Sequence, residues 1–203
     1  MRQGRGDWAQ RWNAERLDSR VTELLRHWSE DPAGAAGQLD AVLRAATPQS
    51  VLFLAETYRR RHHSLEPLLS TGTDSSAGTD SSAGTDSSAG TDSSAGTDSS
   101  AGRFVEDSGS YPTGVAALLT LDRSGRLREA GLRRLAASEE RFVLPYLLLR
   151  LDDPVDPVRD IAVDAVRHRQ RVDGVEVLVP MAPLLDRLAG RRRAGPLVRA
   201  LRP

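Results

Sequence analysis

The chain has 203 residues, with 28 basic and 28 acidic side chains and a formal net charge of zero. This length allows one domain or two small ones, and the neutral charge argues against a protein built chiefly to coat nucleic acid or an anionic membrane. The absence of cysteine excludes disulfides, iron–sulfur clusters, zinc–thiolate sites and a cysteine nucleophile.

Arginine supplies all 28 basic side chains, and lysine is absent. Isoleucine and asparagine each occur once, and because all three amino acids have A/T-rich codons, the composition indicates a GC-rich, bacterial coding genome. The first residues lack the apolar core of a secretory signal, and no apolar run approaches the roughly 20 residues of a membrane span. We therefore expect a cytoplasmic protein with no membrane partner.

Apolar residues at helical spacing predict three helices in residues 1–70, an N-terminal helical segment. The first carries its apolar stripe from Leu17 to Trp28 and stops at Asp31-Pro32, and the second runs from Leu39 to Ala46. The third begins at Thr47-Pro48, with threonine as the N-cap and proline at the first helical position. No segment alternates with a period of two for long enough to predict a strand.

Trp8 and Trp12 lie one turn apart just upstream of this first stripe and extend its pattern. A tryptophan pair at this spacing is either an anchor for a partner protein or part of a terminal helix that docks on the core. The sequence leaves both interpretations open.

A perfect hexapeptide repeat, Thr-Asp-Ser-Ser-Ala-Gly, occurs five times from Thr73 to Gly102. Alanine is its only side chain able to bury apolar area, so ordering the tract would cost backbone entropy with nothing to offset it. We expect residues 71–102 to be a disordered, flexible linker between the N-terminal segment and residues 103–203. Its origin, natural or engineered, stays open.

Residues 144–166 carry the most informative pattern of the second part. An apolar helix ends near Leu151, and Asp152-Asp153-Pro154 then turns the chain, because a proline disfavours the helical conformation of the residue before it. Asp156 is placed to cap a second helix whose first position is Pro157.

This stretch resembles a HEAT repeat of the kind found in bacterial proteins with phycobilisome-lyase-like HEAT repeats. The positions that match the pattern are Pro145, Asp153, Val158-Arg159, Ala162 and Val166. A weaker copy spans residues 114–136, and a single constant offset aligns its Leu127-Arg128 with Val158-Arg159. This copy departs from the pattern at Gly131, where alanine is expected.

A third unit begins at Val175 and carries leucines at helical spacing up to Leu188. A stack of such repeats ends in a cap with a polar outer face, and nothing after Leu197 looks like one. We therefore expect that the array is truncated or that a partner covers its last apolar stripe.

The resemblance implies an all-α fold, a short α-solenoid of HEAT-like antiparallel helix pairs interrupted by the disordered tether. It implies that Arg128 and Arg159 reach an aspartate at the adjacent turn, such as Asp153. It also implies a non-catalytic scaffold or adaptor that binds another protein through the successive second helices of the pairs. The residues expected on that face are Arg128, Arg133, Arg159 and Asp160.

The sequence contains no assembled catalytic or ligand-binding motif. None of the four histidines is spaced i, i+4 from another, adjacent carboxylates on a helix do not face each other, and GxSxG, GxGxxG and a Walker lysine are absent. We therefore expect no catalytic residue, metal site, cofactor or small-molecule ligand. Resemblance to HEAT-like DNA glycosylases or phycobilin lyases keeps an enzyme as the third alternative.

Two arginine clusters supply the second alternative, nucleic-acid binding, because phosphate contacts require little beyond concentrated positive charge. No stacking aromatic residue is interleaved with either cluster, which weakens this interpretation. The candidate polyanion-binding residues are Arg59, Arg60, Arg61, Arg191, Arg192 and Arg193.

Overall fold

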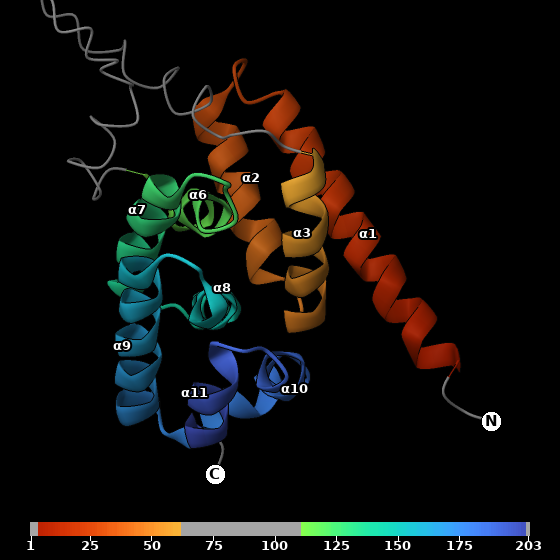
Figure 1. Cartoon of the computed structure of the whole chain (residues 1–203). Coiled ribbons are helices and arrows are strands. Elements are labelled where there is room, and N and C mark those ends of the chain that lie inside the picture. Colours follow the sequence, from red (N-terminus) through yellow and green to blue (C-terminus); the bar gives the residue numbers. More distant parts are fainter. Residues whose placement is uncertain (1–3, 62–110, 202–203) are drawn as a thin grey trace, which may run out of the picture.

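The computed structural model describes residues 4–61 and 111–201, which are helices joined by short turns, with no strand in these two ranges (Figure 1). The prediction of an all-α protein is therefore confirmed. The predicted linker, residues 71–102, lies outside the described residues.

The N-terminal segment forms the three predicted helices, α1 (Gly4–Arg26), α2 (Pro32–Arg44) and α3 (Pro48–Arg61). Thr47 starts α3 as predicted, because its Oγ1 accepts a hydrogen bond from the Ser50 backbone N–H at 3.2 Å. Asp31 is the N-cap of α2 and accepts from the Gly34 backbone N–H at 2.9 Å, so α2 starts at Pro32 rather than near Leu39. Asp31-Pro32 is thus a start signal for α2.

The second part contains helix pairs, two of which begin at matching intervals. Its α-helices are α6 (Thr113–Leu119), α7 (Gly125–Ala136), α8 (Leu144–Leu149), α9 (Asp156–Asp173), α10 (Ala182–Ala189) and α11 (Ala194–Leu201). The 3₁₀ segments are η2 (Arg141–Val143), η3 (Arg150–Asp152) and η4 (Val175–Met181). The offset from the start of α6 to that of α8 equals the offset from α7 to α9, and both equal the offset between the two sequence copies. The last pair, α10 and α11, follows after a longer interval.

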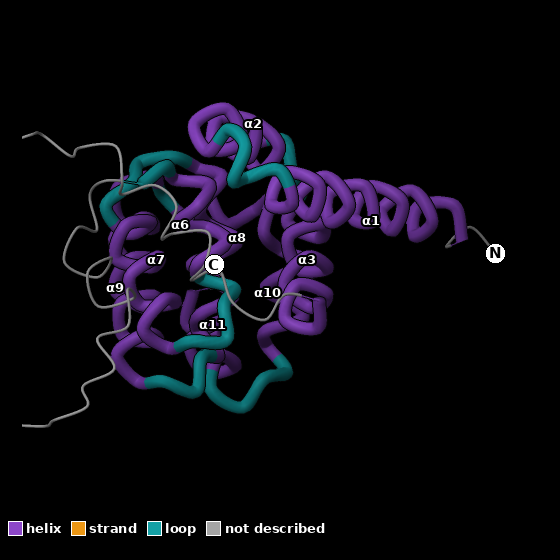
Figure 2. The backbone as a smooth tube through the Cα atoms, turned by 90° about the horizontal axis from the view of Figure 1, so that it is seen from above, coloured by secondary structure: helices purple, strands orange, loops and turns teal. Residues whose placement is uncertain are grey.

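The helices α6 and α8 lie in the middle of the molecule. α7 and α9 pack on one side of them, while α2 packs on α6 and α3 packs on α8 from the other side (Figure 1, Figure 2). Every residue of α6 and α8 is consequently buried. Both helices are therefore apolar all round rather than on one face, because no side of either helix meets water.

One hydrophobic core joins the N-terminal segment to the second part. It extends from Leu17 on α1 to Leu201 on α11 and includes side chains from every α-helix described. Packing between the two segments therefore stabilises both of them, and neither segment has a separate core. In the part of the chain that the structure describes, no helix has the length and apolar character needed to cross a membrane.

Polar contacts cross the same junction. Asp40 of α2 accepts a hydrogen bond through Oδ1 from the Gly114 backbone N–H at 2.5 Å, at the first turn of α6. Arg44 pairs with Glu140, and its Cζ lies 4.9 Å from the centroid of the Phe142 ring. α2 is therefore attached to the second part by charge as well as by apolar packing.

Gly131 marks the departure of the weaker repeat from the HEAT pattern, and the packing of α6 against α7 explains it. A Cβ at this position would lie 2.6 Å from the Ala116 carbonyl oxygen and 2.8 Å from Leu119 Cβ. Both distances are well inside van der Waals contact, so an alanine does not fit. The close approach of α7 to α6 therefore requires glycine.

Candidate interaction sites

Three charged side chains form a buried cluster between α7 and the turn before α9. Arg128 donates from Nε to Asp153 Oδ2 at 2.8 Å and from Nη2 to Asp153 Oδ1 at 3.0 Å. Arg150 Nη1 donates to Asp153 Oδ2 at 3.1 Å. The side chains of Arg128, Arg150 and Asp153 are 7%, 4% and 0% exposed. The predicted contact between Arg128 and Asp153 is confirmed.

The surroundings of Asp153 favour its ionised form. Burial by itself raises the pKa of this carboxyl, but hydrogen bonds from Arg128 and the Val155 backbone N–H, with the charges of Arg150 and Arg128, outweigh burial and hold the pKa below its ordinary value. The carboxylate is therefore charged at neutral pH and holds two guanidinium groups inside the protein. These bonds fasten the turn between α8 and α9 to α7.

The turns before α7 and α9 repeat the same hydrogen bonds at equivalent positions of the two sequence copies. Asp122 and Asp153 each accept, through Oδ1, the backbone N–H of the residue two positions on, at 2.7 and 3.0 Å. Arg128 and Arg159 each donate from Nη1 to the carbonyl oxygen six positions back, at 3.1 and 3.0 Å. The internal repeat is therefore one of local bonding as well as of sequence.

Asp156 does not cap α9 as the sequence predicted. The N-cap residue is Val155, and no side-chain hydrogen bond caps the helix. Asp156 instead accepts a hydrogen bond from Arg159 Nη2 at 2.7 Å. Asp153, three residues earlier, bonds the backbone of this turn in its place.

The four residues predicted for a partner surface differ in position. Arg128 is buried, and its guanidinium is bound to Asp153, so it is not available to a partner; this corrects its placement on that surface. Arg133 and Asp160 are exposed, and the side chain of Arg159 is 21% exposed. Because α7 packs against α9, the three remaining residues lie on neighbouring helices.

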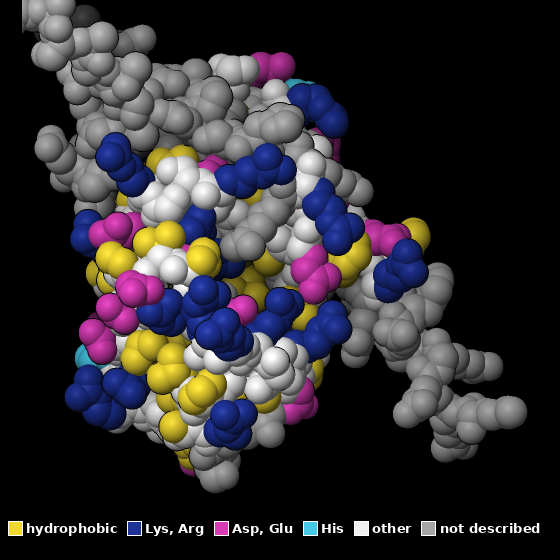
Figure 3. Space-filling view, viewed as in Figure 1, with side chains coloured by type: hydrophobic (Ala, Val, Ile, Leu, Met, Phe, Trp, Pro, Cys, Tyr) yellow, Lys and Arg dark blue, Asp and Glu magenta, His cyan; other side chains and the backbone are white. Residues whose placement is uncertain are grey.

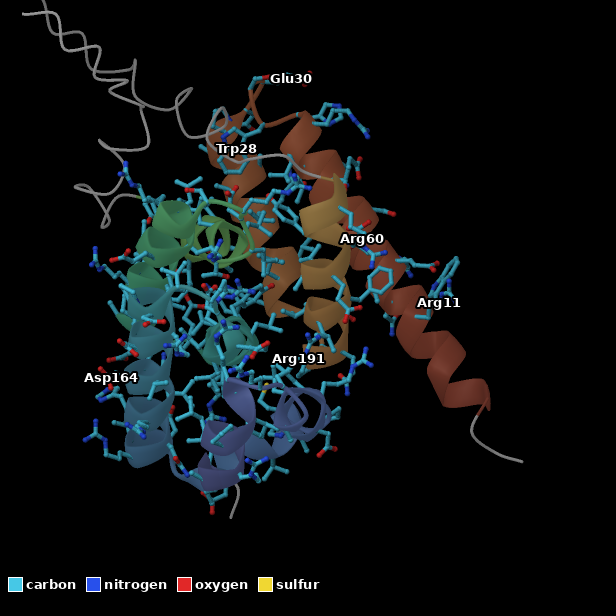
Figure 4. All side chains as sticks on the ribbon, viewed as in Figure 1. Arg11, Trp28, Glu30, Arg60, Asp164 and Arg191 are labelled. Carbon is cyan, nitrogen blue, oxygen red and sulfur yellow. The ribbon has the colours of Figure 1, made fainter. Side chains whose placement is uncertain are left out.

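The two arginine clusters contribute to one cleft. Arg60 of α3 and Arg191, which follows α10, both line a cleft of about 580 Å³ where α3, η3 and α10 meet. Figure 4 shows Arg60 along α3 and Arg191 at the end of the molecule that holds α10 and α11, and Figure 3 shows basic side chains gathered across this face. Arg192 and Arg193 are exposed but do not line the cleft. The side chains of Arg59 and Arg61 lie outside the described part of the chain.

The deep part of the cleft combines apolar side chains with the buried Arg150 and Asp153, and its rim is charged. The apolar lining consists mainly of Leu52, Ala55, Leu149 and Leu188. Exposed basic side chains on the rim are Arg60, Arg187 and Arg191. The acidic rim residues are Glu56 and Asp152, and Glu56 Oε1 lies 3.7 Å from Arg187 Nη2.

Sequence reasoning found the two arginine clusters but missed the cleft they share. A signal was present in α3, because Leu52, Glu56 and Arg60 recur every four residues and therefore lie along one side of the helix. The opposite wall comes from α10, which is far from α3 along the chain. No local pattern in either helix states that the two walls meet.

The tryptophans of α1 are divided between core and surface. Trp28, just after the helix, is buried, whereas Trp12 is 51% exposed; the side chain of Trp8 is not described. α1 extends upstream to Gly4, so both Trp8 and Trp12 belong to the first helix, as their spacing predicts. Figure 2 shows α1 projecting beyond the other helices. The anchoring role of Trp12 stays a prediction.

Within the two described ranges, no group of three or more His, Asp or Glu side chains is arranged to hold a metal ion. No family model, curated protein or solved structure significantly matches the chain. The resemblance to HEAT repeats over residues 144–166 therefore stays a prediction.

Proposed function

We propose that the chain is a non-catalytic helical-repeat protein that binds another protein through the outward side of α7 and α9. The observation that carries the proposal is the hydrogen-bond pattern repeated at Asp122 and Asp153. This repeated pattern places α7 and α9 in equivalent ways after their turns, and the Arg128–Asp153 ion pair then fastens the α6–α7 pair to the α8–α9 pair. A repeated unit joined in this manner is the usual frame of a binding surface.

The outward side of α9 has a charge pattern suited to recognition. Its exposed acidic residues, Asp156, Asp160 and Asp164, come first, and its exposed Arg167 and Arg171 come last. Figure 4 shows Asp164 on the side of α9 that faces away from the other helices. Such an order complements the helix dipole and offers a partner two regions of opposite sign.

The proposal also draws support from the resemblance to HEAT repeats. In that pattern the arginine of one unit reaches the aspartate of the next, and Arg128 and Asp153 have this relationship. A buried ion pair of this kind fixes the arrangement of the helices that carry it, because separating the two charges would leave each of them buried without a counter-charge. A scaffold needs that rigidity more than it needs reactive groups.

The test is site-specific photo-crosslinking from a photoreactive amino acid at position 133 or 160 of the full chain. Position 16 on α1 is the control, since Arg16 is exposed on a different helix. Positions 133 and 160 should crosslink to the same protein, and position 16 should not. Arg128 is unsuitable for this test, because its substitution would disturb the buried cluster.

The partner identified in this way is then titrated with the double charge reversal Arg133→Glu/Asp160→Arg. We expect its affinity to fall at least about tenfold, while the free energy of unfolding falls by less than about 1 kcal/mol, because both positions are exposed and the Arg133–Glu129 pair that is lost is a surface pair. Equal crosslinking from position 16, no crosslinked protein, or an affinity within about twofold would overturn the proposal.

A further inference from the structure

The cleft between α3, η3 and α10 is long enough for a chain segment. Leu52, Glu56 and Arg60 line one wall, and eight residues of α-helix correspond to about 12 Å along the axis. Arg187, Leu188 and Arg191 also line the cleft, from α10 and the turn that follows it. A hollow of this length, lined by apolar and charged side chains together, suits an extended segment better than a single small ion.

The charges left unmatched in the cleft are positive on balance. Glu56 pairs with Arg187, Asp152 accepts a hydrogen bond from the Arg193 backbone N–H at 3.3 Å, and Asp153 is held by Arg128 and Arg150. Each lining acid thus has a partner inside the protein, but the partner of Asp152 is a neutral N–H group, which leaves the charge of Asp152 unmatched. By contrast, Arg60 and Arg191 form no ion pair with any described residue.

We infer that this cleft binds an extended acidic peptide segment of a partner protein. Arg60 and Arg191 would each take a carboxylate, because a guanidinium binds a carboxylate through two parallel hydrogen bonds. Leu149 and Leu188 would cover an apolar side chain between the two acids. At about 3.3 Å per extended residue, a segment as long as the α3 wall, about 12 Å, takes about four residue-to-residue steps, the spacing of the first and last residues of a pentapeptide.

The lining favours a peptide over a nucleic acid. No aromatic side chain of the described residues lines the cleft, so bases have nothing to stack on. Glu56 and Asp152 can accept hydrogen bonds from peptide N–H groups, whereas a phosphodiester backbone has no donor to offer them. The inference does not rest on the α7–α9 surface, which involves other residues on other helices.

The experiment titrates the isotope-labelled full chain with the pentapeptide Glu-Ser-Leu-Ser-Glu, blocked at both ends, and follows backbone amide resonances. Leu52, Glu56 and Leu188 should shift. Arg60→Ala and Arg191→Ala should each lower the affinity for the peptide about tenfold or more, because each removes a charge-assisted contact. Arg192→Ala is the matched control, because Arg192 is an exposed neighbour outside the cleft. Its affinity for the peptide should stay within about twofold of that of the natural chain. The peptide with Gln in place of both Glu should not bind.

Absence of cleft shifts at millimolar peptide would overturn the inference, and so would an equal loss of affinity in Arg192→Ala. Displacement of the peptide by a lower concentration of a deoxythymidine oligonucleotide would overturn it in favour of nucleic acid. The Arg133→Glu/Asp160→Arg chain should retain the peptide with unchanged affinity. The experiments can therefore contradict the proposal for the cleft and the proposal for the α7–α9 surface independently of each other.

Discussion

Arg128 of α7 and Asp153 of the turn before α9 form a two-point ion pair between distant parts of the sequence, with both side chains almost wholly buried. Taking charged groups out of water is costly unless each is paired and hydrogen-bonded. Here Asp153 meets that condition through Arg128, Arg150 and the backbone of its own turn. The pair therefore selects one arrangement of α7, α8 and α9.

Asp153→Asn should lower the free energy of unfolding by about 3–5 kcal/mol, because it leaves two buried guanidinium groups without their counter-charge. Urea denaturation measures the change. Asp156→Asn is the control, since the side chain of Asp156 is 75% exposed beside Arg159 and its removal should cost less than about 1 kcal/mol. Similar losses for the two variants would contradict a special role for the buried pair.

The stability should also depend on pH through Asp153, whose pKa is lower in the folded protein than its ordinary value. Asp153 then binds a proton more readily in the unfolded chain than in the folded one. Its contribution to the free energy of unfolding is therefore complete above its pKa in the unfolded chain, about 3.9. It is lost as the pH falls below that value through the folded pKa. Urea titrations at successive pH values should show that the free energy of unfolding falls more steeply toward acid pH for the natural chain than for Asp153→Asn. Parallel curves would argue against this linkage.

Gly131→Ala should lower the free energy of unfolding by about 1–3 kcal/mol, because the added Cβ meets backbone atoms of α6 that cannot swing away. Gly37→Ala in α2 is the matched control. A Cβ there has no neighbour within 4 Å, so alanine should raise the stability by about 0.5–1 kcal/mol through helix propensity. Chemical denaturation of the two variants gives changes of opposite sign if the contact between α6 and α7 is as close as described.

Tyr146→Phe should leave the stability unchanged or raise it by about 1 kcal/mol. The Tyr146 hydroxyl is fully buried in α8 and has no hydrogen-bond partner among the described residues, and burial raises its pKa well above the ordinary value for tyrosine. The ring itself fills the core, so Tyr146→Ala should cost about 3–5 kcal/mol. Thermal unfolding of both variants separates the two effects, and a clear loss in Tyr146→Phe would reveal a bond to the hydroxyl.

Much of the candidate site could be predicted because its signals are local. The constant offset between the two repeat copies and the turn at Asp153 follow from residue types at fixed spacings, and the resemblance to HEAT repeats implied the partnership of Arg128 with that aspartate. The assignment of Arg128 to a partner surface was wrong for a different reason. A sequence pattern states that an arginine meets an aspartate, but only the packing around them decides that both are buried.

The sequence by itself determined that the chain is helical, where α3 begins, and that two helix pairs correspond at one constant offset. These features depend on apolar spacing, on the Thr47 cap and on turn residues, which act over a few neighbouring positions. Only the tertiary structure decided that α2 and α3 cover α6 and α8, that Gly131 has no room for a Cβ, and that Arg60 and Arg191 share one cleft. Each of these depends on which helix faces meet, and that is set by side-chain packing between residues far apart in the chain.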